Sequence, residues 1–193
     1  MKSPKGILWC ILGLSIIASS HAMSGERGKG TEAHLVARGK YLVNFGGCND
    51  CHSTKTFGPR GPEVDTTMLL AGSPAHAPVP EYPASMLGPG RWGGACTGDM
   101  TAWAGPWGIS FAANLTPDVT TGIGSWTETM FIKALRTGRH MGEGREILPP
   151  MPWQMIRKLS DEDLKAIYAY LRSIPPVENA VREPLPPPSL GAR

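Results

Sequence analysis

The stretch Cys48-Asn49-Asp50-Cys51-His52 decides how this chain of 193 residues is organised. C-x-x-C-H is the attachment signature of a c-type haem. The two thiols add across the vinyl groups of the porphyrin, and the histidine after the second cysteine is delivered to one face of the iron. The pattern therefore predicts a single covalent haem c on Cys48 and Cys51, with His52 as the proximal iron ligand.

Three other interpretations of this cysteine pair fit the sequence less well. A zinc site needs a second pair of cysteines or histidines at ligand spacing, which the sequence does not contain. A thioredoxin-like redox pair needs a strand and a helix around it, and a plain disulfide needs no histidine beside it. Neither of the last two explains His52.

The first 22 residues are typical of a secretory signal. Two lysines precede an apolar run, and a small-residue cleavage site follows it. The run is about a dozen residues long, well short of the roughly 20 that a membrane span requires. We therefore expect residues 1–22 to be removed on export, with Met23 as the mature start. An uncleaved anchor is the weaker alternative.

The charge balance excludes a nucleic-acid binder and agrees with export. Without the two lysines of the signal, 17 of the 19 Lys+Arg residues face 16 Asp+Glu, so no strongly basic surface is left. Haem is attached outside the cytoplasmic membrane, in a bacterial periplasm that otherwise favours disulfides. We expect a periplasmic protein that contacts a membrane only through its partners or through an uncleaved signal.

Two segments have the clearest periodicity of amphipathic helices. Thr31–Phe45 carries apolar residues at helical intervals, with Gly39 between them. Because an interior glycine costs about 0.5–1 kcal/mol relative to alanine, we expect another backbone to approach closely there. The last helix begins after the cap Ser160, has one apolar face and runs to about Ile174. That face is predicted to pack on the first helix, with Gly39 near the contact.

A third helix is predicted in the second half of the chain. Ser125 and Glu128 have the spacing of a capping box, with Ser125 as the N-cap. The apolar stripe that follows runs to about Thr137, where Gly138 can end the helix.

Residues 57–113 differ from the helical segments. Prolines and glycines occur every few residues, so no helix or strand period continues for long. A structureless loop of this length is uncommon inside a compact domain. Three tryptophans favour an insertion that wraps on the core, although they could also shield a haem edge: Trp92, Trp103 and Trp107. A polar leader, residues 23–30, and a Pro-rich tail, residues 178–193, flank the predicted domain of residues 31–177.

The order of these features resembles class I c-type cytochromes, in which the haem motif follows an N-terminal helix and a methionine loop precedes a C-terminal helix. More narrowly, five short motifs resemble the haem modules of bacterial dehydrogenase cytochrome c subunits: Arg38-Gly39-Lys40-Tyr41-Leu42, Asn114-Leu115-Thr116-Pro117-Asp118, Thr121-Gly122-Ile123-Gly124, Leu135-Arg136-Thr137-Gly138 and Pro149-Pro150-Met151-Pro152-Trp153. The resemblance covers residues 31–177. It implies an all-α, class I cytochrome c fold, in which the N- and C-terminal helices cross with the haem between them and residues 57–113 form a long Gly/Pro-rich insertion. Subunits of this kind, such as those of gluconate and alcohol dehydrogenases, often carry three haem modules, whereas this chain has a single C-x-x-C-H.

Met151 is the best candidate for the second axial ligand. It lies between Pro150 and Pro152, whose fixed φ angles stiffen an irregular loop that could hold a thioether toward the iron. The family resemblance implies the same residue. Met141 is an alternative, and its neighbour His140 could instead give an iron with two histidine ligands.

Cys96 is the one cysteine outside the signal and the haem motif. An odd cysteine in an exported protein indicates a free thiol or an intermolecular bridge, and a buried inert thiol is a further interpretation. Cys96 is also a candidate thiolate ligand, as in cytochromes that resemble thiosulfate dehydrogenases, which would lower the potential of the haem.

An iron ligated by His52 and Met151 has both axial positions filled, which favours one-electron cycling over binding of oxygen or peroxide. We therefore expect an electron carrier rather than an enzyme, which passes electrons from an exported dehydrogenase to a terminal oxidase or another cytochrome. Its partners would be redox proteins. The alternative is a haem enzyme with an open or displaceable sixth position, either peroxidase-like or thiosulfate dehydrogenase-like with Cys96 as ligand.

Overall fold

The structure is a computed structural model that describes residues 17–81 and 84–187. The predicted signal, residues 1–22, therefore lies largely outside the described residues, as does the end of the tail, residues 188–193. The chain divides into two units, Met1–His34 and Leu35–Arg193. The first unit contains the beginning of helix α1, and every other helix and strand of the described residues lies in the second unit.

Helix α1 (Ile17–Phe45) leads directly into the haem motif. It ends where the sequence predicts, but it begins before Thr31, so the expected polar leader is helical. Two glycines end α1, and the N–H of Gly46 donates to the carbonyl of Leu42 at 2.8 Å. The short helix α2 (Cys48–His52) follows after Gly47. The motif thus occupies a single helical turn at the end of α1.

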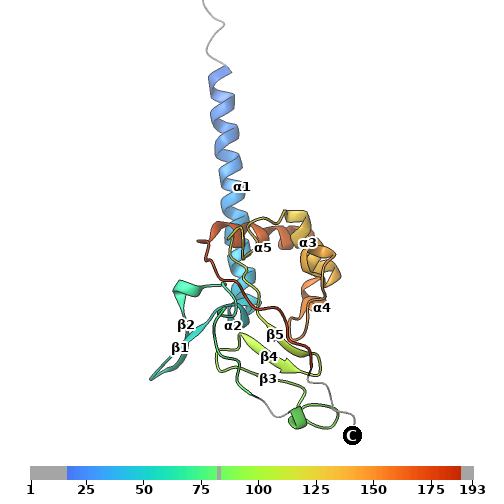
Figure 1. The fold of residues 1–193 in the computed structure, drawn as a ribbon. Helices are drawn as coiled ribbons and strands as arrows, with labels where there is room; N and C mark the ends of the chain where they lie inside the picture. Colours follow the sequence, from blue (N-terminus) through green and yellow to red (C-terminus); the bar gives the residue numbers. More distant parts are fainter. Residues whose placement is uncertain (1–16, 82–83, 188–193) are drawn as a thin grey trace, which may run out of the picture. The chain divides into compact units, whose positions relative to one another are not determined.

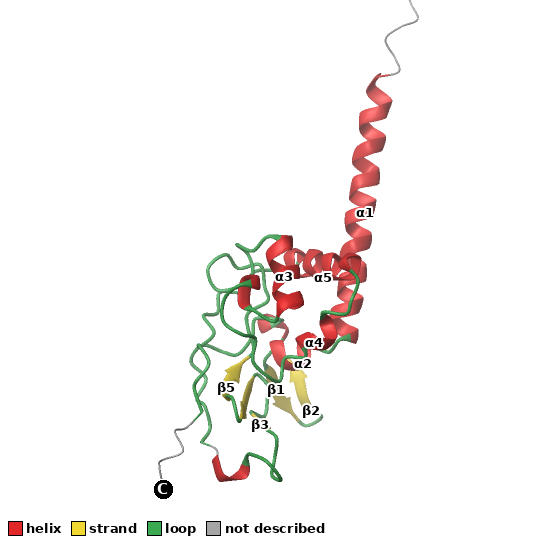
Figure 2. Cartoon of the chain, turned by 90° about the vertical axis from the view of Figure 1, so that its right-hand side faces the viewer, coloured by secondary structure: helices red, strands yellow, loops and turns green. Residues whose placement is uncertain are grey.

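The expected all-α fold is wrong, because the second unit contains two small antiparallel sheets and is mixed α/β. β1 (Lys55–Gly58) and β2 (Gly61–Val64) form a hairpin, and β3 (Ala95–Cys96), β4 (Ala102–Gly105) and β5 (Gly108–Phe111) form a sheet in the order β3-β4-β5. Figures 1 and 2 both show the strands at one end of this unit and helices α3 and α5 at the other.

Turn chemistry explains these strands. Each hairpin closes over two residues between paired glycines, Gly58 with Gly61 in the first and Gly105 with Gly108 in the second. Gly61 and Gly108 have φ values of +102° and +96°, which glycine adopts without the steric penalty of a side chain. The same glycines that interrupt the helical periodicity of the insertion therefore allow its chain to reverse.

The helices of the second half are α3 (Glu128–Thr137), α4 (Trp153–Ile156) and α5 (Asp161–Ser173). α3 begins two residues later than the capping box predicts, because the hydroxyl of Thr127, not that of Ser125, accepts the N–H of Met130, at 3.2 Å. For α5 the prediction is confirmed: Ser160 is the cap, and its hydroxyl accepts the N–H of Asp163 at 3.1 Å.

The core of the second unit confirms the predicted crossing of the first and last helices. A Cβ atom placed on Gly39 would lie 1.9 Å from the carbonyl oxygen of Ala166 in α5, so only a glycine permits this approach. α3 also contacts α5. The buried residues that form the core cluster come from α1, α3, α5 and the connecting segments: Val43, Leu70, Ile123, Phe131, Leu135, Leu164, Ile167, Tyr170 and Leu171.

The segment after α5 has no helix in its described part and is anchored to the insertion. Asn179 is buried, and its amide donates to the carbonyls of Ala71 and Ser73 at 2.7 and 2.9 Å. Leu185 exchanges two backbone hydrogen bonds of 2.9 Å with Ile109 of β5. The described part of the predicted tail is therefore extended and held in place.

Candidate haem site

Helix α2 presents the two cysteines and the histidine of the haem motif. Cys48 and Cys51 are half-buried free thiols, and His52 is buried, with 8% of its surface exposed. Burial raises the pKa of both thiols, so each carries its proton at neutral pH. The motif therefore offers two free thiols next to a histidine, as the covalent attachment of a haem c requires.

The orientation of His52 suits an iron ligand. Its Nδ1 lies 2.8 Å from the carbonyl oxygen of Ala113, and because a carbonyl only accepts, Nδ1 carries the proton. The other ring nitrogen, Nε2, then keeps its lone pair for a metal. Burial also lowers the pKa of His52, which favours the neutral imidazole that binds iron. Both effects come from the insertion and the core packed around α2.

Lys55 fastens the haem motif to the insertion. Its ammonium group donates to the carbonyl oxygens of Ser53, at 2.9 Å, and Asp99, at 2.7 Å. It also donates to the carbonyls of Asn49, at 3.4 Å, and Asp50 in α2. A cation at this position satisfies carbonyl groups that the end of a short helix leaves without partners.

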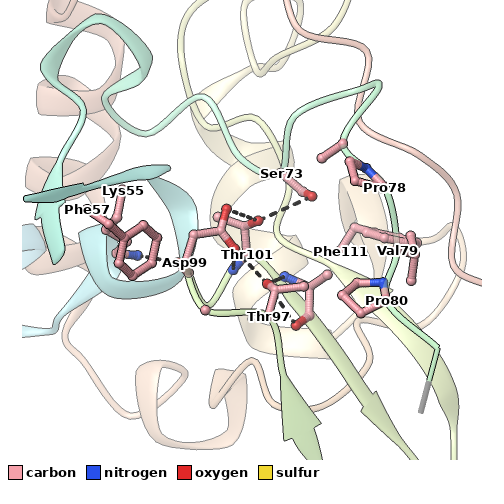
Figure 3. A pocket seen from close by; sticks show the side chains of 13 residues that line it. Lys55, Phe57, Ser73, Pro78, Val79, Pro80, Thr97, Asp99, Thr101 and Phe111 are labelled. Atoms are coloured by element: carbon pink, nitrogen blue, oxygen red, sulfur yellow. Dashed lines mark hydrogen bonds between the residues drawn. The ribbon is translucent and has the colours of Figure 1, made fainter.

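A pocket of about 280 Å³ is lined by Lys55 and lies between β1, the segment 73–80 and the connection from β3 to β4 (Figure 3). Asp99 contributes a carboxylate to the pocket lining, which accepts hydrogen bonds from the hydroxyls of Thr97, at 2.6 Å, and Thr101, at 2.9 Å. Phe57 and Phe111 belong to its apolar lining. Because the carboxylate is already bonded within the protein, these contacts fix the fold of the β3–β4 connection.

The candidates for the second axial ligand differ in burial, and Met151 stays a prediction. Its side chain is half-buried and packs against the core cluster. Met141 is 38% exposed and lies in a short turn, where its φ is +54°. His140 meets the ring of Trp126 edge-on at 4.9 Å, and Cys96 is an exposed thiol in β3. Exposure gives no support to Met141 or Cys96 as the enclosed ligand of an iron.

Sequence reasoning named the cysteines, the histidine and the methionine as candidates, but it missed the groups that contact them. Ala113 contributes a backbone carbonyl, which leaves no mark in a sequence. Lys55 lies three residues after His52, at the C-terminal end of α2, where a cation is favourable; that spacing is the one available signal. The residues present fit a c-type haem. In the described residues no cluster of three or more His, Cys, Asp or Glu could hold a metal ion alone, but a haem iron needs only axial ligands from the protein.

Comparison with known proteins places these observations in a family context. No family model matches the chain. The gluconate 2-dehydrogenase cytochrome c subunit of Pantoea cypripedii is 30% identical over 181 residues, which are 93% of this chain and 31% of that protein. This chain is a homologue of bacterial dehydrogenase cytochrome c subunits. The fructose dehydrogenase cytochrome subunit of Gluconobacter japonicus is 34% identical over 137 residues, covering 60% of this chain and 28% of the relative.

A third homologue extends the set of dehydrogenases. The cytochrome c subunit of the quinone-dependent alcohol dehydrogenase of Gluconacetobacter polyoxogenes is 31% identical over 131 residues, which are 60% of this chain and 28% of that protein. The chain thus spans about a third or less of the length of these relatives. The homology confirms the resemblance inferred from the five motifs, and it supports an electron-transfer haem protein with haem c as cofactor. In the part of the chain that the structure describes, no helix is both long and apolar enough to cross a membrane.

Proposed function

We propose that this chain is a periplasmic one-electron carrier with one covalent haem c, ligated by His52 and Met151. It passes electrons from an exported dehydrogenase to a terminal oxidase or another cytochrome. The observation that carries the proposal is the hydrogen bond from His52 Nδ1 to the carbonyl of Ala113, which leaves the lone pair of Nε2 free for an iron, next to the two half-buried thiols of the motif.

The chemistry follows from what each residue does. When bound, the haem supplies an iron that changes its charge by one electron. Cys48 and Cys51 anchor the porphyrin, so the cofactor stays with the protein while partners exchange. His52 is held by the carbonyl of Ala113, and Met151, which packs against the core cluster, would be the second ligand of the iron. Two ligands from the protein would keep small oxidants from the iron.

The proposed donor is chosen from the relatives. Those with gluconate 2-dehydrogenase and fructose dehydrogenase in their names are cytochrome subunits. A chain of this kind with one haem motif would accept electrons from such a dehydrogenase and release them to the next redox protein. The secretory pattern of residues 1–22 supports the periplasm as the site of this exchange, because haem is attached there.

Mass spectrometry of the exported protein tests the haem assignment. In a host that attaches haem c, we expect the mass of the processed chain plus one haem. The double variant Cys48→Ala, Cys51→Ala is the matched control and should have the mass of the polypeptide alone. A wild-type protein without added mass in the same host would overturn the proposal.

A spectrum recorded with and without cyanide or carbon monoxide separates a carrier from a haem enzyme. The spectrum of a carrier whose iron has both ligands from the protein should change little at concentrations of cyanide or carbon monoxide that saturate an open haem. Rapid and complete binding of carbon monoxide to the reduced protein would favour the enzyme alternative. The carrier should also be reduced by a periplasmic dehydrogenase and its substrate, and be reoxidised by an oxidised cytochrome.

A further inference from the structure

The last strand of the insertion and the residues directly after it contact both segments that carry the proposed iron ligands. Ser110 in β5 donates its hydroxyl to the carbonyl oxygen of Pro149 at 2.6 Å, two residues before Met151. Three residues after Ser110, the carbonyl of Ala113 accepts the proton of His52 Nδ1. Three residues of extended chain span at most about 10 Å. One short stretch of backbone therefore ties the proximal and the distal segments together.

We propose that Ser110 is a positioning residue that holds the Met151 loop against the haem. The inference rests on the proposed function, in which Met151 is the distal ligand. It assigns to the insertion a role beyond shielding, because the hydroxyl that fixes the distal loop comes from β5.

The Met151 loop has few other means of being fixed by hydrogen bonds. Pro149, Pro150 and Pro152 have no N–H group to donate. The N–H of Met151 donates to the carbonyl of Leu148, which belongs to the same loop, at 3.3 Å. The bond from Ser110 is thus a tie between this loop and a separate element of the fold.

Backbone hydrogen bonds hold strand β5, and with it Ser110, in a fixed position. Trp103 of β4 pairs with Ser110, and the neighbouring Ile109 exchanges two backbone hydrogen bonds with Leu185. β5 is therefore held on both sides. Ser110 itself is 8% exposed, so its hydroxyl has little water to bond with instead of Pro149. Loss of the hydroxyl should loosen the distal loop and leave β5 in place.

The test compares Ser110→Thr with Ser110→Val in the haem-loaded protein. The two side chains have nearly the same shape, but only threonine keeps the hydroxyl. An added ligand binds the ferric iron only when Met151 has left it, so apparent affinity rises with the population of the open state. Losing one hydrogen bond should raise the affinity of Ser110→Val for imidazole about two- to tenfold over that of Ser110→Thr. The far-red methionine–iron band should also be lost at lower pH in the valine variant.

Ser73→Ala is the control, because Ser73 is a buried serine of the same insertion whose hydroxyl accepts a hydrogen bond from Thr101, also in the insertion. Its imidazole affinity should equal that of the wild type. If both residues at position 110 overpack the site, Ser110→Ala with the same measurements replaces the pair. A purely structural serine would lower the denaturation midpoint and leave the affinity unchanged, and that result would overturn the inference.

The outcomes separate this inference from the proposed function. If the wild type has no covalent haem or no methionine–iron band, the proposed ligation by Met151 fails. If the wild type has the band and the threonine and valine variants bind imidazole equally well, the ligation stands and the role of Ser110 is refuted.

Discussion

Gly39→Ala tests the crossing of α1 and α5, on which the second unit of the chain is built. A Cβ at position 39 would lie 1.9 Å from the carbonyl oxygen of Ala166 and 2.8 Å from Cβ of Tyr170. Ordinary contacts begin at 3.4 Å, so the helices would have to separate by about 1.5 Å, the difference between 3.4 and 1.9 Å. Neither obstacle is the flexible end of a side chain, so neither can rotate away.

The magnitude follows from two opposed effects. Alanine stabilises a helix interior by about 0.5–1 kcal/mol relative to glycine. Overpacking a core typically costs about 1–3 kcal/mol, and a clash with backbone belongs at the upper end of that range. We therefore expect Gly39→Ala to lower the free energy of unfolding by about 2 kcal/mol. A leucine at the same position should lower it further.

Urea denaturation of the haem-loaded protein, followed by the haem absorbance and by circular dichroism, measures this effect. Gly58→Ala is the matched control, because a Cβ at that position meets nothing within 4 Å. It should change the free energy of unfolding by no more than about 0.5 kcal/mol. If Gly39→Ala unfolds at the same urea concentration as the wild type, or at a higher one, the two backbones do not approach closely and the reasoning is refuted.

Two further predictions concern the distal ligand and the acid stability of the fold. Met151→His should keep a closed low-spin haem but lose the far-red methionine–iron band, and it should lower the potential of the haem because imidazole is the stronger donor to ferric iron. Met141→Leu and Cys96→Ser should change neither the band nor the potential. A band that survives in Met151→His and disappears in Met141→Leu would move the ligand to position 141. Hydrogen bonds from Thr121 hold the pKa of Asp118 below its usual value of about 3.9, so the carboxylate stabilises the fold above that pH and this stabilisation is lost as the pH falls through the folded pKa. The difference in unfolding free energy between the wild type and Asp118→Asn should therefore be largest at pH 7 and shrink toward pH 3, and an equal difference at both pH values would refute the role of the charge.

The helices could be predicted because their signals are local. The cap at Ser160 and the end of α1 follow from neighbouring residues, and the crossing at Gly39 follows from one glycine that a helix would otherwise exclude. The start of α3 could not be fixed in this way. Ser125 and Thr127 are both capping residues within three positions, and the hydrogen bond that selects Thr127 is visible only in the structure.

The strands escaped prediction because they are too short to show a period of two. Each has two to four residues, and strand alternation needs about four to eight to be recognised. A different signal was available. Gly58-Pro59-Arg60-Gly61 and Gly105-Pro106-Trp107-Gly108 both place proline second and glycine fourth, as in a type I turn. The glycines and prolines that break helices here also mark where two strands reverse.

In the candidate site too, some residues can be predicted from a local sequence motif, whereas other contacts arise only when the chain is folded. Cys48, Cys51 and His52 are readable because a covalent haem requires them within five consecutive residues. The carbonyl of Ala113 lies 61 positions from His52, and the hydroxyl of Ser110 lies 39 positions from Pro149. Every residue has a carbonyl and serines are common, so neither contact leaves a pattern in the sequence. Because both contacts come from one short stretch after β4, a substitution in the insertion should alter how firmly Met151 is held without changing either of the two proposed iron ligands.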